Sequence, residues 1–120
     1  MGTTKAISEI YEDYPLVAAT PNTTTSVDLT QGYGASLHVK MLNGATGPTL
    51  AAQVQIEVSA DNTSWFDFGG AMVGGTDNDG EYQWGGIEIP MGVEFIRLTA
   101  SGNTDETVTI NADISQITVV

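Results

Sequence analysis

Few side chains in this sequence could carry out catalysis. The chain has one histidine, His38, and no cysteine, so a nucleophilic triad would need His38 as its general base. No Gly-x-Ser-x-Gly turn of the kind that presents a nucleophilic serine accompanies it. One histidine without cysteine also falls short of a transition-metal site built from His and Cys ligands. The sequence therefore predicts a protein that is not an enzyme, with no catalytic residue and no cofactor.

Carboxylates are more abundant, and they are densest at residues 77–81. Asp77, Asp79 and Glu81 alternate with other residues in a flexible stretch, as the oxygen ligands of calcium sites often do. An EF-hand loop that starts at Asp77 would need glycine at its sixth position, which Tyr82 occupies, and a helix after the loop. Asp77, Asp79 and Glu81 are therefore a weak candidate for a calcium site, and the alternative is a hydrophilic loop.

Aromatic residues gather in two segments, 65–68 and 82–84. Exposed aromatic rings on one face of a β-sandwich can stack on sugar rings, whereas buried rings pack the core or a subunit interface. Both interpretations stay open for Trp65, Tyr82 and Trp84, which are the candidates for an interface or a sugar platform.

The charge of the chain is strongly negative. Fifteen Asp and Glu residues outweigh three Lys and Arg residues, which gives a net charge of −12 at pH 7. Such a chain repels phosphate groups, and three scattered cations, Lys5, Lys40 and Arg97, do not form a basic track. We therefore expect no binding to nucleic acid or to an anionic membrane surface. No apolar run approaches the ~20 residues of a membrane-spanning helix.

The pattern of the sequence predicts that strands, not helices, position these groups. The 120 residues suit one domain, glycine occurs 14 times, and charged residues, which usually cover exposed helix faces, make up only 15%. Residues 35–42 and 53–59 alternate between apolar and polar side chains, as half-buried strands do. Seven or eight short strands separated by turn residues predict an all-β fold, a single antiparallel β-sandwich or jelly-roll-like domain.

Three irregular features are expected within this fold. Gly69–Gly80 contains five glycines and predicts a long surface loop. Gly85-Gly86 interrupts the strand predicted at 82–89 and indicates a bulge. The apolar residues of 107–120 change parity, so a bulge or bend is expected near Ser115-Gln116.

The first 26 residues are expected to form an N-terminal arm, followed by a sandwich domain over residues 27–120. Apolar residues recur every three or four positions between Lys5 and Tyr14, which is compatible with a short helix that Pro15 ends. An extended segment with a few apolar anchors is the alternative. The candidate anchors for a partner are Ile7, Ile10, Tyr11, Tyr14 and Leu16.

Several segments between residues 35 and 115 form strands and turns in a distinctive order. They are Val54–Asn62 with Trp65, Ile89-Pro90 with Val93–Leu98, and Ser101–Asp105 before Val108. This order of strand, Ser-x-Asp-Asn hairpin, Trp, Ile-Pro, aromatic-x-Arg-Leu and Gly-Asn-Thr-Asp resembles small β-sandwich virion proteins of tailed bacteriophages. The resemblance includes the head decoration (cement) proteins, and its motifs are structural, so no catalytic or ligand residue carries over.

The resemblance implies a structural role. Head decoration proteins bind the outer surface of a capsid in many copies, usually as homotrimers, and clamp neighbouring capsid subunits. For this chain it implies the major capsid protein as the partner, the outer surface of the virion as the location, and residues 1–26 as a capsid-binding arm. The alternatives are another virion component, in the tail or a head fibre, and a carbohydrate-binding or adhesion module.

Overall fold

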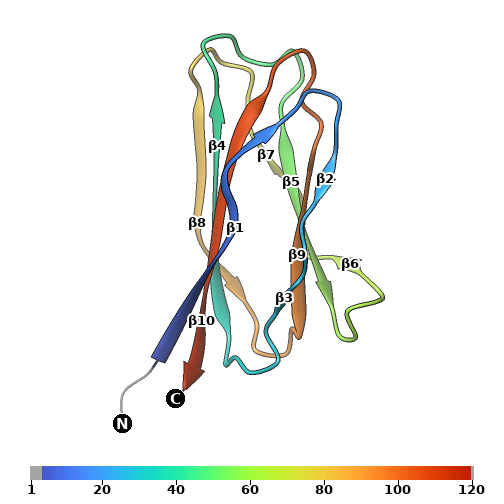
Figure 1. Cartoon of the computed structure of the whole chain (residues 1–120), viewed down its shortest axis with the longest axis vertical. Coiled ribbons are helices and arrows are strands. Elements are labelled where there is room, and N and C mark those ends of the chain that lie inside the picture. Colours follow the sequence, from blue (N-terminus) through green and yellow to red (C-terminus); the bar gives the residue numbers. More distant parts are fainter. Residues whose placement is uncertain (1–3, 120) are drawn as a thin grey trace.

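Two antiparallel β-sheets pack face to face in this protein (Figure 1). The computed structural model describes residues 4–119. In that range there is no helix, and so none that is long and apolar enough to cross a membrane. The strands are β1 (Thr4–Leu16), β2 (Asn22–Thr23), β3 (Val27–Asp28), β4 (Ala35–Asn43), β5 (Gln53–Ser59), β6 (Phe66–Asp67), β7 (Met72–Val73), β8 (Glu81–Ile89), β9 (Phe95–Ser101) and β10 (Val108–Val119).

The order of the strands is that of a jelly roll. One sheet has the order β1-β10-β4-β8, and the other has the order β2-β9-β5-β6. Because β2 and β3 both pair with β9, and β6 and β7 both pair with β5, each of these pairs is one interrupted strand. The chain then forms two four-stranded sheets whose connections cross between the layers, as in double Greek keys. The predicted antiparallel sandwich is confirmed.

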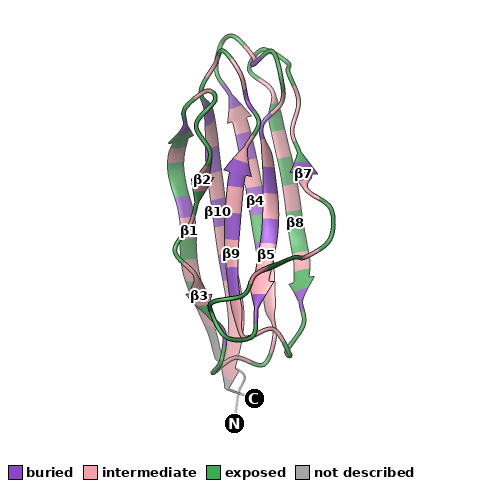
Figure 2. Cartoon of the chain, turned by 90° about the vertical axis from the view of Figure 1, so that its right-hand side faces the viewer, coloured by how far each residue is buried: buried purple, intermediate pink, exposed green. Residues whose placement is uncertain are grey.

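Alternation along the longer strands creates the core. Every second residue is buried between the sheets along β4, β9, most of β5 and β10 up to Ile114, and the intervening residues are more exposed (Figure 2). Apolar burial of this kind stabilises a fold by ~25 cal/mol per Å² removed from water. The fully buried members include Leu37, Met41, Val54, Ile96, Leu98, Val108, Ile110 and Ile114.

The N-terminal segment is the edge strand of one sheet. β1 pairs antiparallel with β10 along its whole length, and Tyr11 and Leu16 are buried in the core. The part of the expected arm that the structure describes, residues 4–26, therefore belongs to the sandwich and does not project from it as a separate unit. Residues 1–3 of the expected arm lie outside the described residues.

The helix considered for Lys5–Tyr14 is wrong, because bulges in β1 imitate a helical spacing. The register with β10 shifts between Glu9 and Tyr11 and again between Tyr11 and Tyr14. Each extra residue turns a two-residue alternation into a spacing of three, which is the separation of neighbours on a helix face. At the second bulge Asp13 has a φ of 45°, and its N–H donates to the side-chain oxygen of Asn111 at 2.8 Å.

The bulge predicted at Gly85-Gly86 is confirmed. On β4 the step from Leu37 to Val39 spans two residues, whereas their partners on β8, Ile87 and Trp84, are three residues apart. Gly86 has a φ of 67°, a left-handed conformation that glycine adopts without strain. The loop predicted at 69–80 contains the short strand β7.

The irregularity expected near Ser115-Gln116 lies further along the strand. β10 pairs with β4 in continuous register through Gln116. In this part of β10 the register with β1 is regular from Asp113 to Ile117, which pairs with Lys5, and shifts beyond Ile117, since Val119 pairs with Thr4. The change of parity in the sequence therefore predicts the presence of a bulge but not its position.

The buried side-chain amide of Asn103 holds the C-terminal end of β1 in place. The side-chain nitrogen of Asn103 donates to the carbonyl oxygens of Leu16 and Glu106, both at 2.9 Å. The backbone carbonyl oxygen of Asn103 accepts a hydrogen bond from the N–H of Ala19 at 2.9 Å. Asn103 is 1% exposed, so these bonds are shielded from water.

We predict that Leu16→Ala destabilises the protein by about 2–5 kcal/mol, because it leaves a cavity in the core. Val17→Ala is the matched control, since Leu16 is 0% exposed and Val17 is 54% exposed. The control should change the free energy of unfolding by ~0.5 kcal/mol or less. Urea denaturation of both variants measures this, and equal losses would show that β1 is not part of the cooperative core.

Candidate interaction surfaces

His38 supports the fold at a bulge. It lies exposed on β4, and its Nδ1 accepts a hydrogen bond from the N–H of Gly86 at 3.2 Å. Within residues 4–119, no group of three or more His, Asp and Glu side chains is arranged to hold a metal ion.

Residues 77–81 form a turn whose polar groups are held by the protein itself. The side-chain nitrogen of Asn43 donates to the carbonyl oxygens of Gly75 at 3.1 Å and of Asp77 at 2.8 Å. Glu81 lies 3.5 Å from the ammonium group of Lys40. The side chains of Asp77 and Asp79 are exposed. Among the described residues, these carboxylates do not converge on a calcium site.

The aromatic residues considered as a sugar platform lie on different sheets. Tyr82 and Trp84 are on β8, where both pack half-buried against the core. The hydroxyl of Tyr82 also accepts a hydrogen bond from the N–H of Asp77 at 3.3 Å. Trp65 precedes β6 in the other sheet, and the guanidinium of Arg97 lies 4.1 Å from the centre of its ring. The three rings therefore do not form one exposed row.

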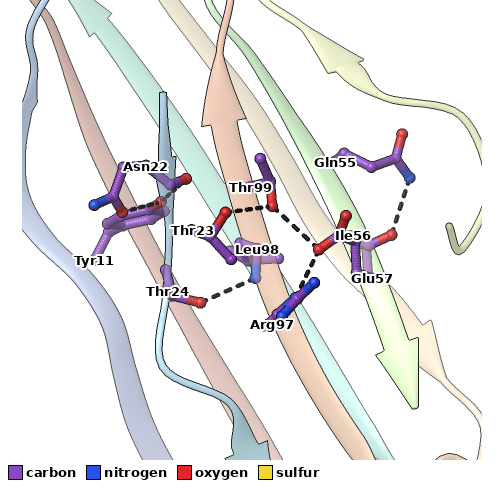
Figure 3. A network of polar contacts seen from close by, with 10 residues as sticks. All are labelled: Tyr11, Asn22, Thr23, Thr24, Gln55, Ile56, Glu57, Arg97, Leu98 and Thr99. Atoms are coloured by element: carbon purple, nitrogen blue, oxygen red, sulfur yellow. Dashed lines mark hydrogen bonds and ion pairs between the residues drawn. The ribbon is translucent and has the colours of Figure 1, made fainter. Parts of the chain in front are cut away.

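Arg97 is the centre of a polar network on the outer face of the second sheet (Figure 3). Its Nε donates to Oε1 of Glu57 at 2.7 Å, and the hydroxyl of Thr99 donates to the same oxygen at 3.1 Å. The hydroxyl of Thr23 lies 3.1 Å from that of Thr99. The network thus joins β5, β9 and β2, and it compensates the charge of Arg97 within the chain.

The N-terminal residues considered as anchors differ in exposure. Leu16 and Tyr11 are in the core, and Ile10 and Tyr14 are half-buried against it. Ile7 is 72% exposed. Of these five side chains, Ile7 alone presents most of its apolar surface to a partner.

Tyr11 connects the two sheets at the edge where β1 lies next to β2. Its hydroxyl donates to the side-chain oxygen of Asn22 at 2.9 Å, which joins β1 to β2 (Figure 3). Burial raises the pKa of the Tyr11 phenol, and the neighbouring Tyr14, whose ring centre is 5.0 Å away, raises it further. Tyr11 therefore remains a neutral hydrogen-bond donor while the protein is folded.

Sequence reasoning missed two exposed apolar side chains, Tyr33 and Met91, and considered a third, Phe66, only as part of the aromatic segment 65–68. Tyr33, Phe66 and Met91 are each more than half exposed, and we call them the apolar end. Tyr33 and Met91 line one hollow together with Ile117, and Phe66 lines a second hollow with Val93. In Figure 1 the β3–β4 and β8–β9 connections, which carry Tyr33 and Met91, lie at the same end of the sandwich as the chain termini, whereas β6, which begins with Phe66, lies at the side of the second sheet. Tyr33 and Met91 each adjoin glycine in turns, a signal that could have identified them as exposed.

The outer face of the sheet β1-β10-β4-β8 is acidic. A shallow groove there is lined by Glu9, Glu12, Asp13 and Asp113, and by His38 and Lys40 from β4 of the same sheet. These carboxylates disfavour anionic partners on this face.

Comparisons with known proteins identify the fold. No protein-family model and no curated protein matches the chain. A structure of the Gx strain of infectious bursal disease virus has a TM-score of 0.67 and 10% identity, and the match covers 96% of this chain and 32% of the viral chain. The VP2 subviral particle of infectious bursal disease virus gives a TM-score of 0.58 at 11% identity, with coverage of 96% and 32%. The fold is one used in virus particles.

A pilus structure shares the same fold. The disulfide-linked pili that form Bacillus endospore appendages match with a TM-score of 0.56 and 12% identity, over 100% of this chain and 93% of theirs. By contrast, the chain spans about a third of the length of the viral chains, at 32%. At these identities the likeness concerns the fold alone.

We predict that Tyr11→Phe lowers stability by about 1 kcal/mol at pH 8, because the hydrogen bond to Asn22 is lost. The pKa of Tyr11 is raised in the folded state, so its contribution is complete below the unfolded pKa of ~10 and is lost as pH rises above it. The difference between the wild type and Tyr11→Phe should therefore shrink at about pH 11. Urea denaturation at both pH values measures it, and a constant difference would contradict the raised pKa.

Proposed function

We propose that this protein is a non-enzymatic virion structural protein that decorates the outer surface of a capsid in many copies. The observation that carries the proposal is the apolar end, since Tyr33, Phe66 and Met91 are each more than half exposed on a domain whose net charge is −12. Exposed apolar side chains gathered at one place are typical of a protein interface. The jelly-roll fold supports the proposal, because structures of virus particles share it.

The function would rest on additive contacts. Each copy binds through its apolar end across neighbouring subunits of the major capsid protein, so that separating the subunits requires the loss of those contacts as well. Many such links strengthen the shell together even when each is weak. The acidic faces point away from the capsid and keep decorated particles apart by charge repulsion.

The resemblance of the segments around Trp65, Ile89-Pro90 and Ser101–Asp105 to tailed-bacteriophage proteins narrows the proposal to a phage head. It also favours the major capsid protein as the partner, and the resemblance implies a homotrimer, the usual assembly of head decoration proteins. The half-buried Tyr82 and Trp84 give less support to the carbohydrate-binding alternative, which needs exposed rings in a row.

A second candidate is a subunit of a surface filament. It is favoured by the near-complete coverage of the spore pilus subunit, 93%, against 32% for the viral chains. This chain has no cysteine, so a filament of it would be held by packing and strand pairing rather than by disulfides.

Counting copies in purified particles tests the proposal. Particles are purified by density gradient from a culture that carries the gene, and quantitative mass spectrometry gives the copies of this chain per major capsid subunit. We expect a ratio of the same order as one. A trace amount would contradict decoration and favour a tail or fibre position, and enrichment in a filament fraction would favour the second candidate.

Variants of the apolar end give the matching test on purified components. Phe66→Ser and Met91→Ser remove apolar contact area, and each should weaken binding to undecorated capsids roughly tenfold. Val73→Ser is the control, since Val73 is 55% exposed but lies on β7, outside the apolar end. If the control weakens binding as much, the contact lies elsewhere.

A further inference from the structure

The edge formed by β1 is protected along half of its length. β1 is the outermost strand of its sheet and pairs on one side, with β10. From Glu9 to Tyr14 this pairing shifts register twice, and the side chains of Glu12 and Asp13 are exposed there. Bulges and charges of this kind keep an edge strand from adding another strand.

The other half of β1 has a regular edge. Pairing with β10 proceeds without a shift from Lys5 to Glu9. Ile7, at the middle of this half, is 72% exposed, the highest value among the exposed large apolar side chains that the structure describes. A regular edge strand that also carries an exposed apolar residue is a template for another strand.

We propose that this half of β1 pairs antiparallel with the same half of a second copy, across a twofold axis at Ile7. The backbone register is regular from residue 5 to residue 9, and Ile7 and Glu9 lie on one face of the strand. Pairing centred on Ile7 sets residue 5 of each copy opposite residue 9 of the other. These residues are Lys5 and Glu9, so opposite charges meet twice and Ile7 contacts Ile7.

Charge favours a second copy in this register over other contacts between copies. A net charge of −12 opposes association of two copies at most places on the surface. Lys40 lies 3.5 Å from Glu81, and Arg97 lies 2.7 Å from Glu57, so both cations are already paired within the chain. In the sequence, a lysine and a glutamate stand two residues before and two residues after Ile7, at positions that complement each other across a twofold axis.

The opposite edge of the same sheet is a poorer partner. β8 presents the exposed side chains of Glu81 and Glu88, and the Gly85-Gly86 bulge interrupts it. Pairing β1 of one copy with β8 of the next would therefore bring carboxylates together along an irregular edge. The twofold pairing predicts a dimer, whereas the resemblance to head decoration proteins implies a trimer. The proposed twofold pairing does not rest on the proposed capsid function.

A single introduced thiol tests the pairing, because the chain has no cysteine. Residues that face each other in an antiparallel pair have Cα atoms about 4.5–5.5 Å apart, within the range of a disulfide. We therefore expect Ile7→Cys to form a covalent dimer under mild oxidation. Ser115→Cys is the control: Ser115 pairs with Ile7 from β10, so its two copies would be three strand spacings apart, about 14 Å. Equal rates of linkage in the two variants would overturn the pairing.

Charge reversal tests the register. Lys5→Glu and Glu9→Lys each set like charges opposite one another at two positions, which should raise the dimer dissociation constant on the order of tenfold. The double variant Lys5→Glu/Glu9→Lys restores opposite charges and should restore the wild-type constant. Lys40→Glu makes the same change of charge on β4, two strands from β1, and is the matched control, which should leave the constant within about twofold.

Sedimentation equilibrium gives these constants, and far-UV circular dichroism verifies that each variant is folded. The proposal requires a wild-type dimer whose strength follows the order wild type and double variant above the two single variants. A trimer, a chain that remains monomeric at the highest concentration, or a double variant as weak as the single ones would overturn it.

Discussion

The alternation of side chains along β10 is the constraint on which the sheet β1-β10-β4-β8 depends. Its residues Val108, Ile110, Ala112 and Ile114 enter the core at every second position, and the strand pairs on both sides. A slip of one residue would turn this apolar set outward, so the register of a strand that is buried on one face is strongly fixed. β4 follows β10 without a shift, whereas β1 accommodates the same register by inserting bulges. The irregularity of β1 is thus a consequence of the regularity of β10.

Hydrogen bonds at the edges of the sheets then join the two sheets to each other. Tyr11 reaches from β1 to Asn22 of β2, and the buried Asn103 holds the carbonyl oxygen of Leu16, where β1 ends. Both bonds lie in surroundings with little water, where a lost partner costs more than at the surface. On the outer face of the second sheet, Glu57 and Arg97 neutralise each other. The chain as a whole carries a net charge of −12, which disfavours anionic partners.

The sequence predicts the fold where local pattern and tertiary burial agree. Residues 35–42 and 53–59 alternate regularly, and both form strands of the sandwich. The glycines at 85 and 86 predict their bulge because few other residues adopt a left-handed conformation without strain. β1 was ambiguous because its bulges reproduce the spacing of a helix. The glycines beside Tyr33 and Met91 indicate exposure, but the sequence does not predict the apolar end as a group, since Tyr33, Phe66 and Met91 are far apart in the sequence and line two hollows that form only in the fold.

The pairing of β1 with β10 also determines how this chain must fold. These strands come from opposite ends of the described sequence, so their contact closes a loop of nearly the whole chain and carries a large entropic cost before it is formed. Contacts of such long range are associated with slow folding. Until β10 is in place, Tyr11 and Leu16 have no core to enter, and β1 from another molecule can take the same position. Strand exchange between copies, by which a dimer retains every native contact, is therefore the characteristic error that this topology allows.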